Sequence, residues 1–590
     1  MKQEIDTAGT PVERPRRIAA VGIGALCGLV YGALTWLSLA PVGAWGLAVV
    51  APVPILWAAA RWWDRAGWLA IGVAFGTVPL WLVVQSWVRE VAPGGYVPLA
   101  ILLGAYIGLG AWVMARARRR LGVRAVWLFP LLWVGMEVFR GSVAFDGYAW
   151  FLAAHPLIGS WRLASAGAVV GAYGVSLLVV CVGTAIVLGI ERRARAAAGL
   201  GFGTAAVWFV LTIVPGTRAG EGALRIGVVQ TNVPQSNKQG RGLDERVRDM
   251  DRLIALSREA RAQGAEVIVW PETMYPGFYL DPASVAEAQR VERELPGLAQ
   301  LSAMCAEAVS RLQRELGVPL VVGAEAYEAL RLEVGAEVRE DFDASYNSAY
   351  LIRDGGIAGR YDKLHLTPFG EVMPYISAWP WLERTLVNIG VGANLSFRLS
   401  EGSGAVVLDA GVGRLATPIC FEATSPGVCR SLAYAGGERR AEVIVNLTND
   451  GWFGGSDAMR RHHEMTARWR AVELGLPLVR AANTGISGAF DHRGRVIERL
   501  GARGEGVLVV SVPRVEGGTA YGVIGDGVGW VGLGVTGLVL VWTFLPGGWG
   551  GRVDKERGGG AARRRDEPGA AGSGTRTSET DRDEDRKDSE

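Results

Sequence analysis

The chain has 590 residues, of which 50% are hydrophobic, with five cysteines and a formal net charge of +3. This length is too great for one ordinary domain, and the small charge gives no reason to expect a nucleic-acid partner. The odd number and irregular spacing of the cysteines argue against a disulfide framework and a zinc motif. Hydrophobic residues crowd into positions 18–217 and 528–545, whereas 224–515 has the composition of a globular domain. We therefore expect a membrane-spanning part and a water-facing part.

The first part of the chain contains seven apolar runs, each near the roughly 20 residues that cross a bilayer. They follow residues 1–17, whose arginines we interpret as a topology signal preceding an uncleaved first span. Together they predict a seven-span transmembrane domain over 18–217. An eighth run predicts a last transmembrane helix within 526–546. The seven runs cover 18–38, 43–60, 66–87, 97–115, 124–140, 164–190 and 199–215.

Arginines gather in alternate connections between the predicted spans, and such basic loops stay in the cytoplasm. Seven spans then bring the chain to the outer face, so 224–515 is predicted to be extracytoplasmic. Both termini are then expected in the cytoplasm, residues 1–17 forming the N-terminal segment; in a bacterial cell this topology is that of an inner-membrane protein. Residues 547–590 are charged and lack a core-forming composition, which predicts a disordered cytoplasmic tail. The basic clusters are Arg14, Arg16 and Arg17, then Arg61 and Arg65, then Arg116, Arg118, Arg119, Arg120 and Arg124, then Arg192, Arg193 and Arg195.

The predicted outer connection from Arg140 to Leu163 is long and rich in aromatic residues. It is interpreted in two ways, as an aromatic belt at the membrane interface or as a lid or lipid-entry element over the soluble domain. Glu137 and Arg140 stand three residues apart at a helix end, a spacing that allows them to pair.

The water-facing part alternates short β-branched runs with amphipathic segments. This alternation, with one hairpin turning at 354–356, predicts a layered α/β domain with a mixed sheet. Predicted strands are 223–230, 267–270, 319–322, 348–360 as a hairpin, 415–419, 443–447, 478–482 and 507–512, and predicted helices are 244–263, 297–316 and 458–474.

Three residues near strand ends could form a covalent catalytic centre. Cys420 ends an apolar run, Glu272 follows Trp270 and Pro271, and Lys363 follows the predicted hairpin. A thiol needs a base to become a nucleophile, a partly desolvated carboxylate can supply it, and an ammonium can stabilise an oxyanion. Each residue alone is weak evidence, because a cysteine in a strand is usually structural and a glutamate or lysine in a loop is usually solvated.

The chain resembles the nitrilase superfamily, whose members use a Glu-Lys-Cys triad on an αββα sandwich in this chain order. The resembling segments are Trp270 to Glu272, Tyr361 to Glu371 and Ile419 to Glu422. More particularly, the chain is similar to the apolipoprotein N-acyltransferase family. That likeness lies in the segments Val229–Gln235, Asn446–Gly454, Arg480–Ser487, Trp133–Arg140 and Gly171–Ser176.

The resemblance implies a multi-pass α-helical membrane domain joined to an α/β nitrilase-like αββα sandwich. It assigns Cys420 as nucleophile, Glu272 as general base and Lys363 as stabiliser of the intermediate. Glu371, Phe421 and Glu422 are assigned as supporting residues near the thiol. Two positions depart from the family: Phe421 replaces a frequent tyrosine, and Ser236–Gln239 lacks a frequent tryptophan.

The implied reaction is ping-pong acyl transfer from a phospholipid, through a cysteine thioester, to the α-amine of a diacylglyceryl-apolipoprotein. No metal or organic cofactor and no nucleic acid is expected, and the protein is expected to be a monomer. Two alternatives use the same residues differently. One is a membrane-anchored nitrilase-type amidohydrolase with water as acceptor, and the other is a non-catalytic membrane scaffold.

Overall fold

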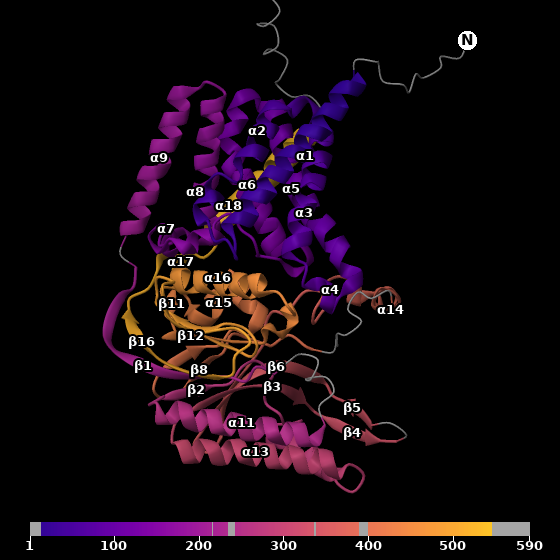
Figure 1. Cartoon of the computed structure of the whole chain (residues 1–590), viewed down its shortest axis with the longest axis vertical. Coiled ribbons are helices and arrows are strands. Elements are labelled where there is room, and N and C mark those ends of the chain that lie inside the picture. The colour runs from indigo at the N-terminus through magenta and orange to yellow at the C-terminus, as the bar shows by residue number, and fades with distance from the viewer. Residues whose placement is uncertain (1–12, 215, 234–241, 336–337, 389–398, 546–590) are drawn as a thin grey trace, which may run out of the picture. The chain divides into compact units, whose positions relative to one another are not determined.

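The computed structural model describes residues 13–214, 216–233, 242–335, 338–388 and 399–545 (Figure 1). The predicted tail at 547–590, most of the N-terminal segment and the family departure at Ser236–Gln239 lie outside these ranges. Most helices of the membrane part come first in the chain, and one, α18 (Gly527–Phe544), follows the water-facing part. Those that come first are α1 (Glu13–Ser38), α2 (Val53–Arg61), α3 (Ala66–Val84), α4 (Val88–Val91), α5 (Pro93–Leu121), α6 (Phe129–Val138), α7 (Trp161–Ala164), α8 (Gly167–Ile190) and α9 (Ala194–Ile213).

Six helical segments of the described chain are long and apolar enough to cross a membrane. One of them, Pro93–Asp146, contains both α5 and α6, and the predicted span at 43–60 corresponds to a shorter apolar helix, Trp45–Arg61. Two of the eight predicted spans are thus short or merged with a neighbour. The membrane character of this part is clear, whereas the count of eight spans and their orientation stay predictions.

The last helix, α18 (Gly527–Phe544), follows the short α17 (Ala520–Ile524) and packs against α6. Small residues allow the close approach: a Cβ at Gly135 would overlap Thr536 Oγ1 and lie 2.5 Å from the Gly532 carbonyl oxygen. Such small-residue contacts are typical of helix packing in membranes, where van der Waals contact replaces the hydrophobic drive.

The water-facing part contains two six-stranded mixed sheets stacked face to face. The alternation predicted from the sequence is confirmed, because parallel strands run through the centre of each sheet and antiparallel strands lie at its edges. In order across the first sheet, the strands are β16 (Gly506–Glu516), β1 (Arg218–Gln230), β2 (Val267–Val269), β3 (Leu320–Glu328), β6 (Ala344–Arg353) and β7 (Gly356–Asp362). The second sheet has β15 (Val496–Leu500), β14 (Ser487–Phe490), β13 (Leu478–Ala482), β12 (Val443–Thr448), β9 (Arg414–Ala416) and β8 (Val407–Asp409).

Helices cover the outer face of each sheet, which gives the αββα order of layers (Figure 1). Helices α11 (Leu243–Ala262) and α13 (Pro296–Leu316) cover the first sheet, and α15 (Pro426–Ala433) and α16 (Asp457–Leu474) cover the second. The strand periodicity explains the layers: Val267 and Val269 belong to the core between the sheets, whereas Ile268 faces the helices α11 and α13. The remaining elements are α12 (Pro282–Arg290), β4 (Arg331–Val334), β5 (Val338–Asp341), α14 (Pro380–Asn388), β10 (Tyr434–Ala435) and β11 (Glu438–Arg439).

Helix α16 joins the sandwich to the membrane part. Trp469 Nε1 donates a hydrogen bond to the His155 carbonyl oxygen at 3.1 Å, and Glu473 Oε1 accepts one from the Ala172 backbone N–H at 2.8 Å. All four residues are buried. In Figure 1, α15 and α16 lie between the membrane helices and the second sheet.

We predict that Gly135→Ala destabilises the protein in detergent by about 1–3 kcal/mol, because the added methyl group overpacks the contact between α6 and α18. The measurement is the thermal unfolding midpoint of the purified protein. Gly534→Ala on α18 is the matched control, since a Cβ there meets no atom within 4 Å. Equal midpoints for the two variants would contradict the close contact.

Candidate active site

Cys420 opens a short 3-10 helix, Cys420–Thr424, directly after the strand-like bridge between Ile419 and Leu447. Its φ angle is +51°, in the left-handed region that costs an L residue about 1–2 kcal/mol. The thiol-bearing residue thus sits on a tight turn between strand and helix. Strained non-glycine residues of this kind gather at functional sites.

Glu272 follows β2 and is buried in the interior. Its two oxygens have separate donors: Asn347 Nδ2 donates to Oε1 at 2.7 Å, and the Asn449 backbone N–H donates to Oε2 at 2.7 Å. Gly323 of β3 leaves the space for this placement, because a Cβ there would lie 2.8 Å from the Glu272 Cα. The carboxylate is therefore fixed by contacts from both sheets.

Lys363 follows β7 and has no exposed surface. Its Nζ donates to Glu371 Oε2 at 2.6 Å and lies 3.9 Å from Glu272 Oε1. Burial alone would lower the pKa of Lys363, but the charges of Glu371 and Glu272 more than offset it, so the pKa is raised. The lysine is a permanent cation beside the glutamate.

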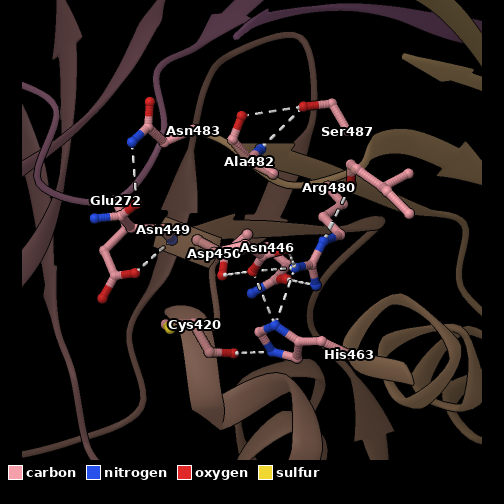
Figure 2. A network of polar contacts seen from close by, with 12 residues as sticks. Glu272, Cys420, Asn446, Asn449, Asp450, His463, Arg480, Ala482, Asn483 and Ser487 are labelled. Atoms are coloured by element: carbon pink, nitrogen blue, oxygen red, sulfur yellow. Dashed lines mark hydrogen bonds and ion pairs between the residues drawn. The ribbon is translucent and has the colours of Figure 1, made fainter. Parts of the chain in front are cut away.

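The Cys420 thiol lies within the electrostatic reach of Glu272, Lys363 and Glu371 (Figure 2 shows the first of these). Burial raises the pKa of this thiol well above its usual range, and the negative charge of Glu272 raises it further, whereas Lys363 opposes the change. The resting cysteine is a neutral thiol. A thiol in this state needs a base at the moment of attack.

Glu422 is fully buried, and its two oxygens accept hydrogen bonds from two separate segments of the chain. Its Oε1 accepts hydrogen bonds from the Tyr361 hydroxyl at 2.8 Å and from the backbone N–H groups of Leu364 at 2.7 Å and His365 at 3.0 Å. Its Oε2 accepts one from the Ile419 N–H at 2.7 Å. Glu422 thus ties the segment after Lys363 to the segment before Cys420. Burial raises the pKa of Glu422 to about 7, while its hydrogen bonds act in the opposite direction.

Phe421 packs against the rings of Trp150 and His365. These are contacts of the ring itself, and the hydroxyl of the tyrosine expected here takes no part in them. The Phe421 centroid lies 6.3 Å from the Trp150 ring and 5.7 Å from the His365 ring, with both pairs nearly parallel. Trp150 comes from the long connection of the membrane part and is 3% exposed. The aromatic-belt interpretation is wrong for Trp150 and Phe151, which are buried against Phe421 and the histidines of α16. Whether this connection acts as a lid or lipid entry stays a prediction.

Sequence reasoning missed several residues that hold the site together. Asn347 donates to Glu272 and also approaches Glu371 at 3.4 Å, yet it sits in mid-strand with no local signal. Asp450, His463 and Arg480 form a buried polar group under Cys420 (Figure 2). Asp450 and Arg480 lie in segments that carry the family resemblance, but His463 lies in a helix. Among the described residues, no group of His, Cys, Asp or Glu could hold a metal ion.

Comparison with known proteins matches both parts of the chain. Residues 225–520 match the carbon-nitrogen hydrolase family, and residues 31–185 match the apolipoprotein N-acyltransferase N-terminal domain. An apolipoprotein N-acyltransferase of Geobacter metallireducens is 30% identical over 86% of this chain and 92% of its own length. The chain belongs to the apolipoprotein N-acyltransferase family.

Other members of the apolipoprotein N-acyltransferase family are similarly related. The protein of Bradyrhizobium diazoefficiens is 32% identical over 66% of this chain and 68% of its own length. The protein of Bordetella bronchiseptica is 30% identical over 88% of this chain and 94% of its own length. A solved amidase from Nesterenkonia sp. aligns over 50% of this chain and 92% of its own, with 19% identity and a TM-score of 0.33.

We predict that Glu422→Gln lowers acyl transfer and destabilises the protein by about 1–3 kcal/mol. An amide NH₂ would face either the Ile419 N–H or the three donors on the other oxygen, so at least one buried donor would lose its acceptor. Thermal unfolding and thioester formation on Cys420 measure the two effects. Glu498→Gln on the exposed edge strand β15 is the control and should leave both unchanged; equal behaviour of the two variants would contradict the role of Glu422.

Proposed function

We propose that this protein transfers a fatty acyl chain from a membrane phospholipid to the α-amine of an apolipoprotein's N-terminal diacylglyceryl-cysteine. Cys420 carries the acyl group as a thioester, Glu272 is the general base and Lys363 stabilises the intermediate. The observation that carries the proposal is the relationship to apolipoprotein N-acyltransferases through both parts of the chain. The convergence of a thiol, a fixed carboxylate and a buried ammonium supports it.

In the first half-reaction the Cys420 sulfur attacks the ester carbonyl carbon of the phospholipid while Glu272 takes the thiol proton. The charge on the carbonyl oxygen is then stabilised by the Lys363 ammonium in a site with little water, where such interactions are strong. Collapse of the tetrahedral intermediate breaks the ester C–O bond. Glu272 returns its proton to the leaving alkoxide, which gives a lysophospholipid and the thioester.

In the second half-reaction the lipoprotein amine attacks the thioester carbonyl and Glu272 takes a proton from the nitrogen. The C–S bond breaks, the sulfur recovers a proton, and the product is an amide. Glu272 suits both roles because Asn347 and the Asn449 N–H hold its oxygens in one place. Glu371 supports Lys363 by neutralising its charge in the resting state.

Both substrates are lipid-anchored, so a site tethered close to a membrane works at a high effective concentration of each. The rings of Phe421, Trp150 and His365 favour exclusion of water, which would otherwise hydrolyse the thioester. We propose that the sandwich lies on the outer side of the bacterial inner membrane. A membrane-impermeant thiol reagent should then label Cys420 in intact spheroplasts, and protection of Cys420 there would contradict this orientation.

The decisive test incubates the purified protein with phospholipid and a diacylated lipopeptide bearing a free α-amine. We expect N-acylated peptide and lysophospholipid in equal amounts, detected by mass spectrometry. Cys420→Ala should lower product formation by at least about 1,000-fold, because no thioester can form. Free fatty acid without N-acylated peptide would instead indicate a hydrolase.

We predict that Glu272→Gln changes two rates in opposite directions. Acyl transfer should fall by about 10²–10⁴-fold, because the general base is lost. Alkylation of Cys420 by iodoacetamide at about pH 8 should become faster, because removing a negative charge lowers the thiol pKa and raises the thiolate fraction. A parallel fall of both rates would mean that Glu272 does not raise the thiol pKa. Glu266→Gln, which lies before β2 far from the thiol, serves as the control.

A further inference from the structure

The turn that carries Cys420 rests on a buried chain of polar side chains (Figure 2). Arg480 Nη2 contacts both oxygens of Asp450, at 2.6 Å and 2.7 Å, and lies 3.0 Å from His463 Nδ1. The other ring nitrogen, His463 Nε2, lies 3.3 Å from the carbonyl oxygen of Cys420. None of these three side chains is more than 1% exposed.

The direction of the hydrogen bonds in this chain follows from the groups themselves. A carbonyl oxygen can only accept, so His463 Nε2 must carry a proton. Burial lowers the pKa of His463 and the Arg480 charge lowers it further, whereas the Asp450 carboxylate and the hydrogen bond to Cys420 act in the opposite direction. The other ring nitrogen, Nδ1, lies 3.0 Å from both Asp450 Oδ1 and Arg480 Nη2, so these two side chains together hold the ring. Asp450 accepts from Arg480, both side chains contact His463 Nδ1, and His463 Nε2 donates to the Cys420 carbonyl oxygen.

The Cys420 carbonyl belongs to the same rigid peptide plane as the Phe421 N–H. In a trans peptide the C=O and N–H bonds point in opposite directions. The hydrogen bond between His463 and the Cys420 carbonyl therefore also sets the direction of the Phe421 N–H, which points away from His463. Phe421 is the second residue of the 3-10 helix Cys420–Thr424, so its N–H has no acceptor within that helix.

We propose that His463, held by Arg480 and Asp450, is a positioning residue that orients the Phe421 N–H as an oxyanion donor alongside Lys363. The inference rests on the proposed acyl transfer at Cys420. The φ of +51° explains the need for such a support, because the backbone of an L residue relaxes from this conformation unless neighbouring contacts hold it. His463 touches the backbone of the nucleophile and none of the triad side chains in the contacts of the described residues.

The test compares two reactions of the same sulfur in the purified full-length protein. Acylation of Cys420 by p-nitrophenyl butyrate passes through an oxyanion, whereas alkylation by iodoacetamide is a direct displacement without one. We expect His463→Ala to slow acylation by about 10- to 100-fold, somewhat less than the loss of an oxyanion donor itself. Alkylation should change by less than about 3-fold, since the thiol and Glu272 are untouched.

His463→Gln is the conservative variant, because its amide N–H can replace the donor at Nε2. It should restore acylation to within about 5-fold of the unmodified protein. His462→Ala is the matched control: it removes the neighbouring buried imidazole of α16, which stacks on Phe151 at 4.0 Å and does not contact Cys420. The ratio of acylation to alkylation should stay unchanged in this variant.

Equal losses of acylation and alkylation in His463→Ala would overturn the inference, because they would indicate a general disturbance of the turn. Failure of a folded His463→Gln to improve on His463→Ala would also overturn it. The ester probe separates this result from the proposed function. If the unmodified protein reacts with the ester but gives no N-acylated lipopeptide from phospholipid, the proposed function fails while the positioning role stands.

Discussion

The site depends on one buried ammonium, that of Lys363, and on the carboxylates that hold it. An ion this deeply buried is tolerated only with close partners of opposite charge. Glu371 is the direct partner, and Glu272 shares the same charge from a longer distance. The ammonium therefore has Glu371 as its direct partner, and Glu272 does not carry that pairing alone. Removing Glu371 would therefore disturb the position of Lys363 and its contact with Glu272 as well.

Helix α16 has two functions on two of its faces. Trp469 and Glu473 bind the membrane part through the His155 carbonyl and the Ala172 N–H. His463, on the same helix, contacts the carbonyl oxygen of Cys420. The turn at Cys420 and the attachment to the membrane part thus share one helix. This is consistent with an enzyme whose substrates arrive from the bilayer.

Much of the sandwich could be predicted because strand signals are local. Alternating or continuous apolar runs marked β1, β2, β12 and β13, and residue type with chain order singled out Glu272, Lys363 and Cys420. Short strands such as β8 and β14 were missed, because they are held by their neighbours more than by their own sequence. Asn347 and His463 could not be found in this way, since their roles arise only when distant elements meet. The membrane connection was also ambiguous, because buried aromatic residues and an interfacial belt have the same composition.

The packing of α18 on α6 has a consequence for the order in which the protein assembles. Gly135 is synthesised early, whereas its partners Gly532 and Thr536 come after the entire sandwich. At about 5–20 residues per second, the two faces are separated by a delay on the order of tens of seconds. During that interval the small-residue face of α6 must be covered by lipid or by another protein. The membrane bundle is therefore closed last, by a helix that enters only after the catalytic domain has been made.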